Sequence, residues 1–416
     1  MSEKNIYQNP KKRFHTMIKP CGAECNLACT YCYYLHKEKL FNQPHSPRMS
    51  DYVLKLLTQQ YIEGNEHDKI VFSWQGGEPT LMGINFFEKA LEYQDLYWYA
   101  GKNIENTLQT NGTLLTDEWA AFLKQHNFLV GLSIDGTENL HDMHRKDKAG
   151  RGTFKRVMEG FKHLQNHKVP FTVLVTVNRH NAKKPLEVYR FLRNELGADY
   201  IQFNPCVEPV SYQNIAPNLW EETFLPKLGT PRSRPGRSES VVTKWSVEPF
   251  DWGNFLCTIF DEWCKNDLGQ VLVNWFETAI AQTMKIPAQI CLTGEICGKG
   301  IAIEHTGDVF SCDHYVYPEY LLGNIKNKKL VDMAFSERQQ IFGFNKRNSL
   351  PQHCLNCPHG ILCWGQCPRH RFLKSPEGEV GLNYLCSGFK IFYSSKKQVI
   401  RQIAAANSVG NAFIRS

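Results

Sequence analysis

The stretch Cys25-Asn-Leu-Ala-Cys29-Thr-Tyr-Cys32-Tyr-Tyr34 places three cysteines at the spacing C-x3-C-x2-C. Iron–sulfur clusters are bound by cysteine thiolates, and three thiolates can bind three of the four irons of a [4Fe–4S] cluster. The fourth iron is then left without a protein ligand, and an open metal position is typical of a catalytic site rather than a structural one. The stretch therefore predicts a catalytic iron–sulfur centre near the start of the chain.

A zinc site built on the same cysteines is the alternative. It needs a fourth Cys or His at close spacing, and Cys21 and His36 are near enough to be candidates. A predicted strand before the triplet, Phe14–Ile18, and the sequence Gly76-Gly-Glu-Pro79 after a second strand favour the cluster. The C-x3-C-x2-C spacing also leaves Cys21 outside the set.

The triplet closely resembles the signature of the radical S-adenosylmethionine (SAM) superfamily. The resemblance implies that SAM binds the free iron and that an electron from the cluster cleaves SAM to a 5′-deoxyadenosyl radical. It also implies that Gly76-Gly-Glu-Pro79 holds the amino group of SAM. The SAM contacts implied by the resemblance are Tyr31, Gly76, Gly77, Glu78, Ser133, Arg145 and Val207. Judged as residues alone, Ser133 could instead cap a helix, and Arg145 could be a surface charge.

At 416 residues the chain can form two domains, or one barrel with an appendage. Its composition, 42% hydrophobic and 21% charged, is ordinary for a globular protein, and its formal charge is +7. Basic residues gather only at Lys11–Arg13 and Arg232–Arg237, which we interpret as solvated segments. Nucleic-acid binding requires a denser basic stripe, so no nucleic-acid partner is predicted.

No apolar run approaches the ~20 residues that span a bilayer, and Met1–Pro10 lacks the apolar core of a signal peptide. We therefore predict a cytoplasmic protein with no membrane partner. Fifteen cysteines in a reducing compartment indicate metal or redox chemistry rather than a disulfide framework. An exposed cluster is oxygen-sensitive, which favours function under anaerobic or low-oxygen conditions.

Short β-rich runs alternate with amphipathic helical windows such as Asp51–Gly64 and Thr153–Gln165. The expected strands are Phe14–Lys19, Ile70–Trp74, Ile104–Thr110, Val130–Ile134, Phe171–Val177 and Tyr200–Asn204. Six strand-then-helix units predict an α/β fold with a parallel sheet and right-handed crossovers. Reactive residues follow these strands, as expected where the carboxyl ends of parallel strands carry an active site. Periodicity does not show whether the sheet closes, but the resemblance implies a partial (β/α)6 radical SAM barrel.

We divide the chain into a partial barrel (14–228), a linker and connecting helical segment (229–290), a cysteine-rich domain (291–390) and a C-terminal helix and tail (391–416). In the connecting segment we expect a helix at Phe250–Leu268 and an extended run at Val271–Phe276. Cys257 and Cys264 lie a heptad apart in an apolar window and are expected to be buried core residues.

Eight cysteines in the third segment form two sets of four, the number that two fully bound [4Fe–4S] clusters need. Two four-cysteine zinc sites are the alternative, which iron and sulfide analysis would distinguish. The run from Cys354 to Cys386 resembles the SPASM extension of peptide-modifying radical SAM enzymes. The resemblance implies three [4Fe–4S] clusters in all, with the two auxiliary clusters bound by Cys291, Cys297, Cys312 and Cys367 and by Cys354, Cys357, Cys363 and Cys386.

Asp313 directly follows one of these predicted cluster ligands. A carboxylate held near buried metal and away from water can have a displaced pKa suited to proton abstraction. The chain as a whole resembles the anaerobic sulfatase-maturating enzymes, with matches that include Ile18–Pro20, Gln75–Pro79, Gly307–Asp313 and Leu382–Cys386. No motif is matched between Val210 and Cys291.

In that family the residue matching Asp313 is the general base, and the residues matching Tyr34 and Gln75 line the substrate pocket. His314 would be in reach as a proton shuttle. The residues alone leave another role open for Asp313, as a hydrogen-bond partner of a metal ligand or a turn former after the cysteine.

The resemblance implies a radical SAM oxidase that converts a Cys or Ser residue of a sulfatase to Cα-formylglycine by Cβ hydrogen abstraction. The implied partners are an unfolded or nascent sulfatase polypeptide and an electron donor such as flavodoxin or ferredoxin. An alternative in the same superfamily is a maturase that cross-links or otherwise modifies a ribosomal peptide. A non-enzymatic iron–sulfur scaffold is a further alternative, but it would have no need of the SAM-binding motif at Gly76–Pro79.

Overall fold

The computed structural model describes residues 12–41 and 46–409. The predicted absence of a signal peptide at Met1–Pro10 and the predicted end of the tail at 410–416 concern residues outside this part of the chain. No helix in the described part combines the length and apolar character needed to cross a membrane.

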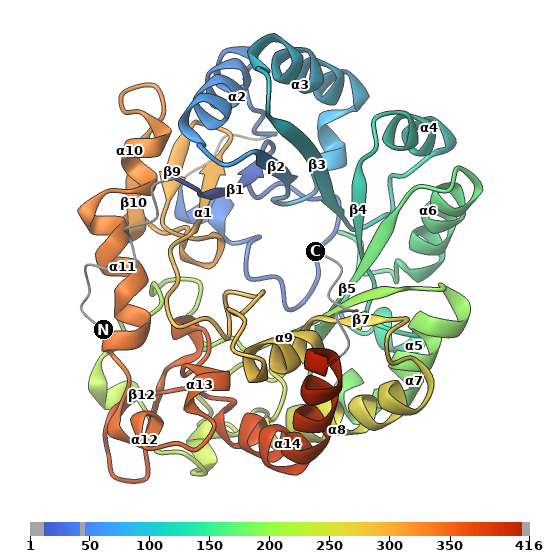
Figure 1. The fold of residues 1–416 in the computed structure, drawn as a ribbon. Coiled ribbons are helices and arrows are strands. Elements are labelled where there is room, and N and C mark those ends of the chain that lie inside the picture. Colours follow the sequence, from blue (N-terminus) through green and yellow to red (C-terminus); the bar gives the residue numbers. More distant parts are fainter. Residues whose placement is uncertain (1–11, 42–45, 410–416) are drawn as a thin grey trace.

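The first half of the chain forms the expected strand-then-helix units. Six parallel strands lie in chain order in one sheet, and each agrees with its predicted range to within one residue at either end. They are β1 (His15–Lys19), β2 (Lys69–Trp74), β3 (Asn103–Thr110), β4 (Leu129–Ser133), β5 (Phe171–Val177) and β6 (Tyr200–Pro205). The strands form a curved sheet with the helices outside it, as in the predicted partial barrel (Figure 1).

Helices cover the outer face of this curved sheet (Figure 1). The longer ones are α2 (Asp51–Gly64), α3 (Ile84–Tyr97), α4 (Asp117–Gln125), α6 (Phe154–Asn166) and α7 (Pro185–Arg190), and the short α1 (Lys37–Leu40) and α5 (Glu138–His141) lie in loops. Helix α2 begins where the Ser50 side chain accepts a hydrogen bond from the Val53 N–H at 3.3 Å, which satisfies a free backbone donor. Its apolar stripe, which includes Val53, Leu57 and Tyr61, is buried against the sheet.

The sheet continues past both of its predicted edges. Strand β8 (Gly300–Glu304) pairs in parallel with β1, and β9 (Asp308–Phe310) and β10 (Leu321–Asn324) follow it as antiparallel strands. At the other edge, the short β7 (Leu272–Val273) pairs with β6. The resulting ten-stranded sheet carries part of the cysteine-rich segment directly beside the strand that precedes the triplet.

The expectation of an extended run at Val271–Phe276 is wrong beyond its first residues. Strand β7 ends at Val273, and helix α9 (Asn274–Thr283) begins at the next residue. Asn274 accepts a hydrogen bond from the Phe203 N–H at 3.2 Å, and Trp275 donates to the Phe203 carbonyl at 2.6 Å. These bonds to β6 fix the first turn of the helix. The sequence pattern could not predict it, because periodicity in a six-residue apolar run does not distinguish a strand from a helix.

Helices α8 (Pro249–Asn266) and α14 (Cys386–Val409) pack against each other and against α9. Aromatic side chains such as Trp252, Phe260 and Phe392 fill the space between them. Cys257 and Cys264 pack against this core as predicted, but both are only half-buried. Both lie on the side of α8 where solvent still reaches the helix.

The remaining elements belong to the cysteine-rich segment. They are α10 (Leu330–Ala334), α11 (Glu337–Asn348), α12 (Gln352–Leu355), α13 (Gly360–Cys363) and a two-stranded sheet of β11 (Leu373–Lys374) and β12 (Val380–Leu382).

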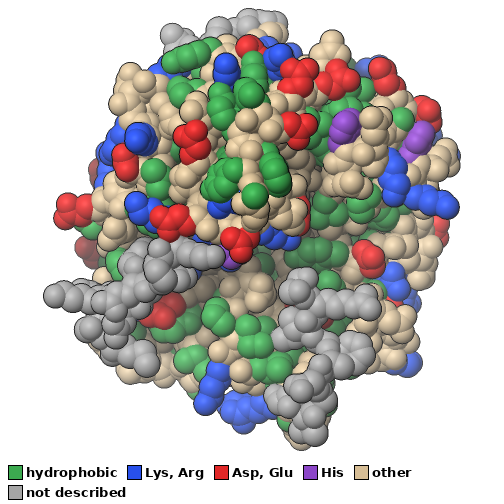
Figure 2. Space-filling model, turned by 45° about the horizontal axis from the view of Figure 1, so that its top comes forward, with side chains coloured by type: hydrophobic (Ala, Val, Ile, Leu, Met, Phe, Trp, Pro, Cys, Tyr) green, Lys and Arg blue, Asp and Glu red, His purple; other side chains and the backbone are tan. Residues whose placement is uncertain are grey.

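Figure 2 shows one face of the molecule, on which basic and acidic side chains are interspersed with hydrophobic ones rather than gathered in a single block.

Candidate active site

The loop that carries the cysteine triplet is joined by backbone hydrogen bonds to the loop after β2. The N–H groups of Gln75, Gly77 and Glu78 donate to carbonyls of residues 18, 22 and 24 at 2.7, 2.9 and 2.8 Å. A Cβ atom at Gly77 would overlap the Glu24 carbonyl oxygen, and Gly76 has a φ of +123°. The glycine pair is therefore required for the close approach of these two loops.

Glu78 is buried and connects the ends of β2 and β3. One carboxylate oxygen accepts hydrogen bonds from the Thr80 N–H (3.1 Å), the Thr80 hydroxyl (2.6 Å) and the Thr110 hydroxyl (2.7 Å). The other accepts only the Asn111 N–H, at 2.8 Å. Burial raises the pKa of Glu78, and these hydrogen bonds partly oppose the shift. Glu78 thus orders the loop, and its second oxygen has room for one more donor.

Cys25, Cys29 and Cys32 lie close enough together to affect one another electrostatically. Burial raises the pKa of Cys29 to about 12, so the thiolate form depends on a bound cation or metal. Cys21 is fully buried, and its thiol donates to the Glu78 carbonyl at 3.2 Å. Cys21 therefore has a structural partner of its own.

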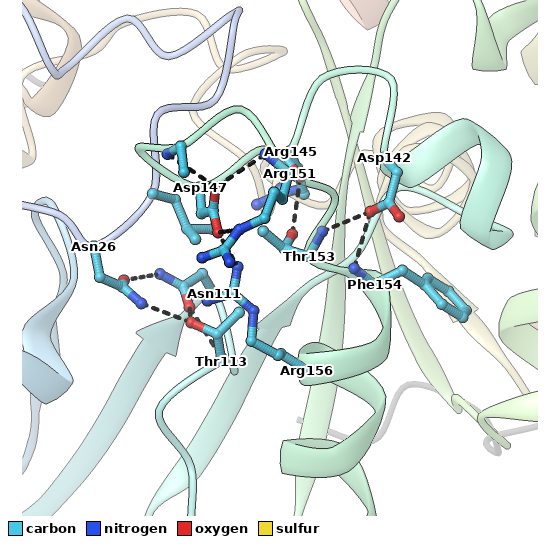
Figure 3. Close-up of polar contacts among 12 residues, drawn as sticks. Asn26, Asn111, Thr113, Asp142, Arg145, Asp147, Arg151, Thr153, Phe154 and Arg156 are labelled. Atoms are coloured by element: carbon cyan, nitrogen blue, oxygen red, sulfur yellow. Dashed lines mark hydrogen bonds and ion pairs between the residues drawn. The ribbon is translucent and has the colours of Figure 1, made fainter.

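Polar contacts hold the cysteine loop against the end of β3 (Figure 3). Asn26 donates to the Thr113 hydroxyl at 2.8 Å, and Asn111 donates to the Asn26 side-chain oxygen at 2.9 Å. Figure 3 also shows Asp142 accepting hydrogen bonds from the Thr153 and Phe154 N–H groups, at 2.7 and 2.9 Å. These bonds fix the segment that carries Arg145.

Arg145 is buried and forms an ion pair with the fully buried Asp135 at 3.1 Å, so the surface-charge alternative does not hold. The Tyr31 hydroxyl donates to the same carboxylate, and the Arg145 guanidinium lies 5.7 Å from the centre of the Tyr31 ring. Among the causes that lower the pKa of Cys29, the positive charge of Arg145 is the largest. Tyr31 and Arg145 therefore lie together beside the triplet.

Ser133 lies at the carboxyl end of β4, where its hydroxyl accepts a hydrogen bond from the Gln109 side chain at 2.9 Å. It caps no helix within the described chain. Val207 is buried just after β6, and Gln75 is half-buried just after β2. All three occupy carboxyl ends of strands, where the active site of a parallel sheet forms.

Asp313 is buried in the short turn after β9 and contacts Lys19 at the carboxyl end of β1. Its carboxylate forms an ion pair with Lys19 and accepts a hydrogen bond from the Tyr33 hydroxyl. Burial alone would raise the pKa of Asp313, but the Lys19 ammonium and the hydrogen bond from Tyr33 oppose it, and the pKa is lowered. Asp313 is thus held ionised, and its lowered pKa makes it a weaker base than an ordinary carboxylate.

Tyr34 is buried on the other side of Lys19. The Lys19 Nζ lies 3.9 Å from the centre of the Tyr34 ring, and the Tyr34 hydroxyl donates to Glu304. The pairing of β1 with β8 places Lys19 opposite Glu304. Lys19 therefore links the predicted base to the predicted substrate-pocket tyrosine.

His314 packs against Tyr33, with ring centres 4.9 Å apart, and its Nδ1 faces the Arg369 guanidinium at 2.7 Å. Arg369 in turn forms a buried ion pair with Glu208. Burial and then the charge of Arg369 lower the pKa of His314 to about 3, so the ring is neutral. Since Nδ1 accepts from Arg369, only Nε2 is free for the proton-shuttle role predicted for this residue.

The eight later cysteines fall into two spatial groups. Cys291, Cys297, Cys312 and Cys367 influence one another electrostatically, and so do Cys354, Cys357, Cys363 and Cys386. The second group lines a single cavity. In the described part of the chain no three Cys, His, Asp or Glu side chains surround a point where a single metal ion would bind.

Sequence reasoning missed several side chains of the site. Lys19 lay within a matched motif, Ile18–Pro20, and so had a signal that could have identified it. Glu208, Glu304 and Arg369 had none, because their roles depend on contacts between segments far apart in the chain.

Comparison with known proteins agrees with this geometry. Residues 20–192 match the radical SAM superfamily and residues 291–358 match SPASM, an iron–sulfur cluster-binding domain. The fold and site are those of a radical SAM enzyme with a second iron–sulfur domain.

More specifically, the chain belongs to the anaerobic sulfatase-maturating enzymes. It is 42% identical to a serine-type anaerobic sulfatase-maturating enzyme of Bacteroides thetaiotaomicron, over 95% of this chain and 94% of that protein. It is 32% identical to a cysteine-type anaerobic sulfatase-maturating enzyme of Clostridium perfringens, over 91% of this chain and 94% of that protein. A solved structure of native anSMEcpe with bound AdoMet and Kp18Cys peptide matches with a TM-score of 0.79 and 29% identity, over 94% of this chain and 99% of that one.

Membership confirms the predicted cofactors, which are SAM and iron–sulfur clusters, and the predicted substrate class, a sulfatase polypeptide. The residues present fit these groups. Eleven cysteines gather in three places, and the triplet lies between the glycine pair and the Arg145–Asp135 pair.

Proposed function

We propose that the enzyme oxidises a Cys or Ser residue of a sulfatase to Cα-formylglycine, with Asp313 as the general base. The observation that carries this proposal is the placement of Asp313 by β1 and β9. Its carboxylate is buried, ionised by Lys19 and held by Tyr33, two residues of the segment that also carries the triplet. A thiol or hydroxyl next to Asp313 could therefore lose its proton while its Cβ faces the radical SAM centre.

SAM bound at the triplet would supply the radical that removes one Cβ hydrogen. The proposed ligands Cys25, Cys29 and Cys32 would hold three irons, and the proposed SAM contacts include Tyr31 and Arg145. The protein's main contribution is orientation, which is worth ~7–11 kcal/mol when a reactive group is held at near-attack distance. Tyr34 and Gln75 would position the substrate chain.

Electrons and protons balance as follows. The substrate residue loses two electrons and two protons: one hydrogen atom would leave from Cβ, one proton would go to Asp313, and a bound iron–sulfur cluster would accept the second electron. With Cys the product is a thioaldehyde, which water hydrolyses to the aldehyde with release of hydrogen sulfide. With Ser the aldehyde forms directly.

The two spatial groups of later cysteines support the proposed partition into two auxiliary clusters. On that partition, about twelve irons would be bound per chain. We further propose the division at residues 14–228, 229–290, 291–390 and 391–416, with the ten-stranded sheet bridging its first and third parts. The finer assignments of a cytoplasmic location and of a flavodoxin or ferredoxin as electron donor are also proposals.

A ribosomal-peptide maturase is the second candidate. The Streptococcus suis SuiB structure bound to its precursor peptide matches with a TM-score of 0.58 at 15% identity, a likeness that shows the fold alone. Family membership therefore favours sulfatase maturation.

Paired peptides test the proposal. Reduced enzyme and SAM are incubated with a Cys-x-Pro-x-Arg peptide and its Ser counterpart, and the peptide masses are measured. We expect loss of hydrogen sulfide with gain of one oxygen for the Cys peptide, and loss of two hydrogens for the Ser peptide if it is a substrate. A cross-linked product, or cleavage of SAM with neither peptide changed, would contradict the proposal.

A further inference from the structure

Two buried cations lie among the auxiliary cysteines. Lys346, in α11, is 1% exposed, and Arg371, between α13 and β11, is 5% exposed. The Lys346 Nζ donates hydrogen bonds only to backbone carbonyls, those of Cys291 at 2.6 Å, Leu292 at 2.8 Å and Gly294. Arg371 likewise donates to backbone carbonyls, those of Lys346, Trp364, Gly365 and Gln366 at 2.6 to 3.1 Å, with one longer contact to the Ser349 hydroxyl.

Neither cation forms an ion pair with any carboxylate of residues 12–41 or 46–409. Three other buried cations near the active site are compensated: Lys19 pairs with Asp313, Arg145 with Asp135 and Arg369 with Glu208. A fourth, Lys37, forms no ion pair with a described residue and lies over the Tyr317 ring, 2.9 Å from its centre. A buried charge without a counter-ion is costly, and carbonyl dipoles replace only part of its lost hydration. The fold therefore leaves two positive charges to be balanced by something else.

Thiol groups of the auxiliary cysteines lie near both cations. Lys346 is close enough to interact electrostatically with Cys291, Cys297 and Cys367. Arg371 interacts with Cys354 and Cys363 as well as with Cys367. A [4Fe–4S] cluster with four thiolates carries a net charge of about −2, and about −3 after it gains one electron.

We propose that Lys346 and Arg371 are the counter-charges of the auxiliary clusters and set their reduction potentials. Lys346 acts on the cluster bound by Cys291, Cys297, Cys312 and Cys367, and Arg371 acts on both. The inference rests on the proposed function, because it uses the proposed partition of the cysteines. A fixed positive charge stabilises the reduced cluster more than the oxidised one, so both residues favour uptake of the electron that substrate oxidation releases.

The test uses the full chain with Cys25, Cys29 and Cys32 changed to Ala, so that only the auxiliary clusters remain. Redox titration followed by electron paramagnetic resonance gives their potentials. We expect Lys346→Met to lower one potential by at least about 59 mV, a tenfold change for a one-electron couple, and Arg371→Met to lower both. Lys346→Arg, which keeps the charge, and Lys397→Met, which removes an exposed charge, are the controls and should leave both potentials near wild type.

Each outcome has a defined meaning. Met variants that bind the full iron content with wild-type potentials overturn the proposal. If the Met variants lose iron while Lys346→Arg and Arg371→Lys retain it, cluster binding depends on the charge and the proposal stands. If the charge-conserving variants also lose iron, the residues act only through their hydrogen bonds and the proposal is wrong. Aldehyde formation by otherwise unaltered Lys346→Met with unchanged potentials would reject this inference and leave the proposed function standing.

Discussion

At the scale of single residues, Asp313 is the side chain on which the proposed chemistry depends. Asp313→Asn keeps the shape of the side chain but cannot take up a proton. We expect aldehyde formation to fall by roughly 10²–10⁴-fold, the usual contribution of a general base, while SAM cleavage persists. Peptide mass spectrometry and chromatography of 5′-deoxyadenosine measure the two separately. Wild-type rates of aldehyde formation would show that Asp313 is not the base.

Lys19 is the counter-ion that allows Asp313 to be buried in its ionised form. Lys19→Met leaves that carboxylate buried and unpaired, a change that typically destabilises a protein by about 3–5 kcal/mol. The double variant Lys19→Met, Asp313→Asn removes both charges, and we expect it to recover most of this loss. Anaerobic thermal unfolding of the single and double variants measures the coupling. If the stability losses of the two single variants add up in the double variant, the ion pair contributes nothing to stability.

At the scale of elements, the meeting of the triplet loop with the loop after β2 depends on Gly77. Gly77→Ala places a methyl group against the Glu24 carbonyl, so we expect loss of the triplet's iron, about four atoms of about twelve. Gly101→Ala is a control for an added methyl group without a clash: Gly101 has a positive φ, which Gly77 lacks, but no atom lies within 4 Å of an added Cβ. Full iron content in Gly77→Ala would mean that the loops can separate without loss of the cluster.

Helix α9 carries a partly buried carboxylate, Glu277, whose pKa is raised by burial to about 7. The ordinary pKa of a glutamate is near 4.5. Between about pH 4.5 and 7 the folded protein therefore holds a proton that the unfolded chain has released. The contribution of protonated Glu277 to the free energy of unfolding is fully present below about pH 4.5 and is lost as the pH rises through 7. We expect Glu277→Gln to unfold at a higher temperature than wild type at pH 8, with the difference vanishing near pH 5. A constant difference across this range would contradict the assigned burial effect.

The elements also show what local sequence can predict. Alternation and amphipathic spacing located β1 to β6 and α2 because each of these elements buries one face in a regular pattern. They did not locate β8 to β10. Strand β8 pairs with β1, which is nearly 300 residues away in the sequence, and β9 and β10 are added in turn to β8. For the same reason the motifs indicated Asp313 but not Glu304 or Arg369, whose partners lie in other segments.

At the scale of the whole molecule, one continuous sheet connects the radical SAM barrel to the cysteine-rich segment. The β1–β8 pairing places Lys19 of the first beside Asp313 of the second, so the proposed base and the proposed radical source belong to one rigid framework. Such a framework is what orientation-dependent catalysis needs, since small displacements of the reacting groups are costly. The site therefore depends on residues of both the barrel and the cysteine-rich segment.

The most direct test of this account follows a single hydrogen atom. A Cys-x-Pro-x-Arg peptide carrying deuterium at the Cβ of its Cys is incubated with reduced enzyme and SAM, and the 5′-deoxyadenosine formed is weighed by mass spectrometry. We predict that one deuterium moves from the peptide to 5′-deoxyadenosine for each aldehyde formed. Aldehyde formation without deuterium in 5′-deoxyadenosine would contradict hydrogen abstraction from Cβ and, with it, the proposed mechanism.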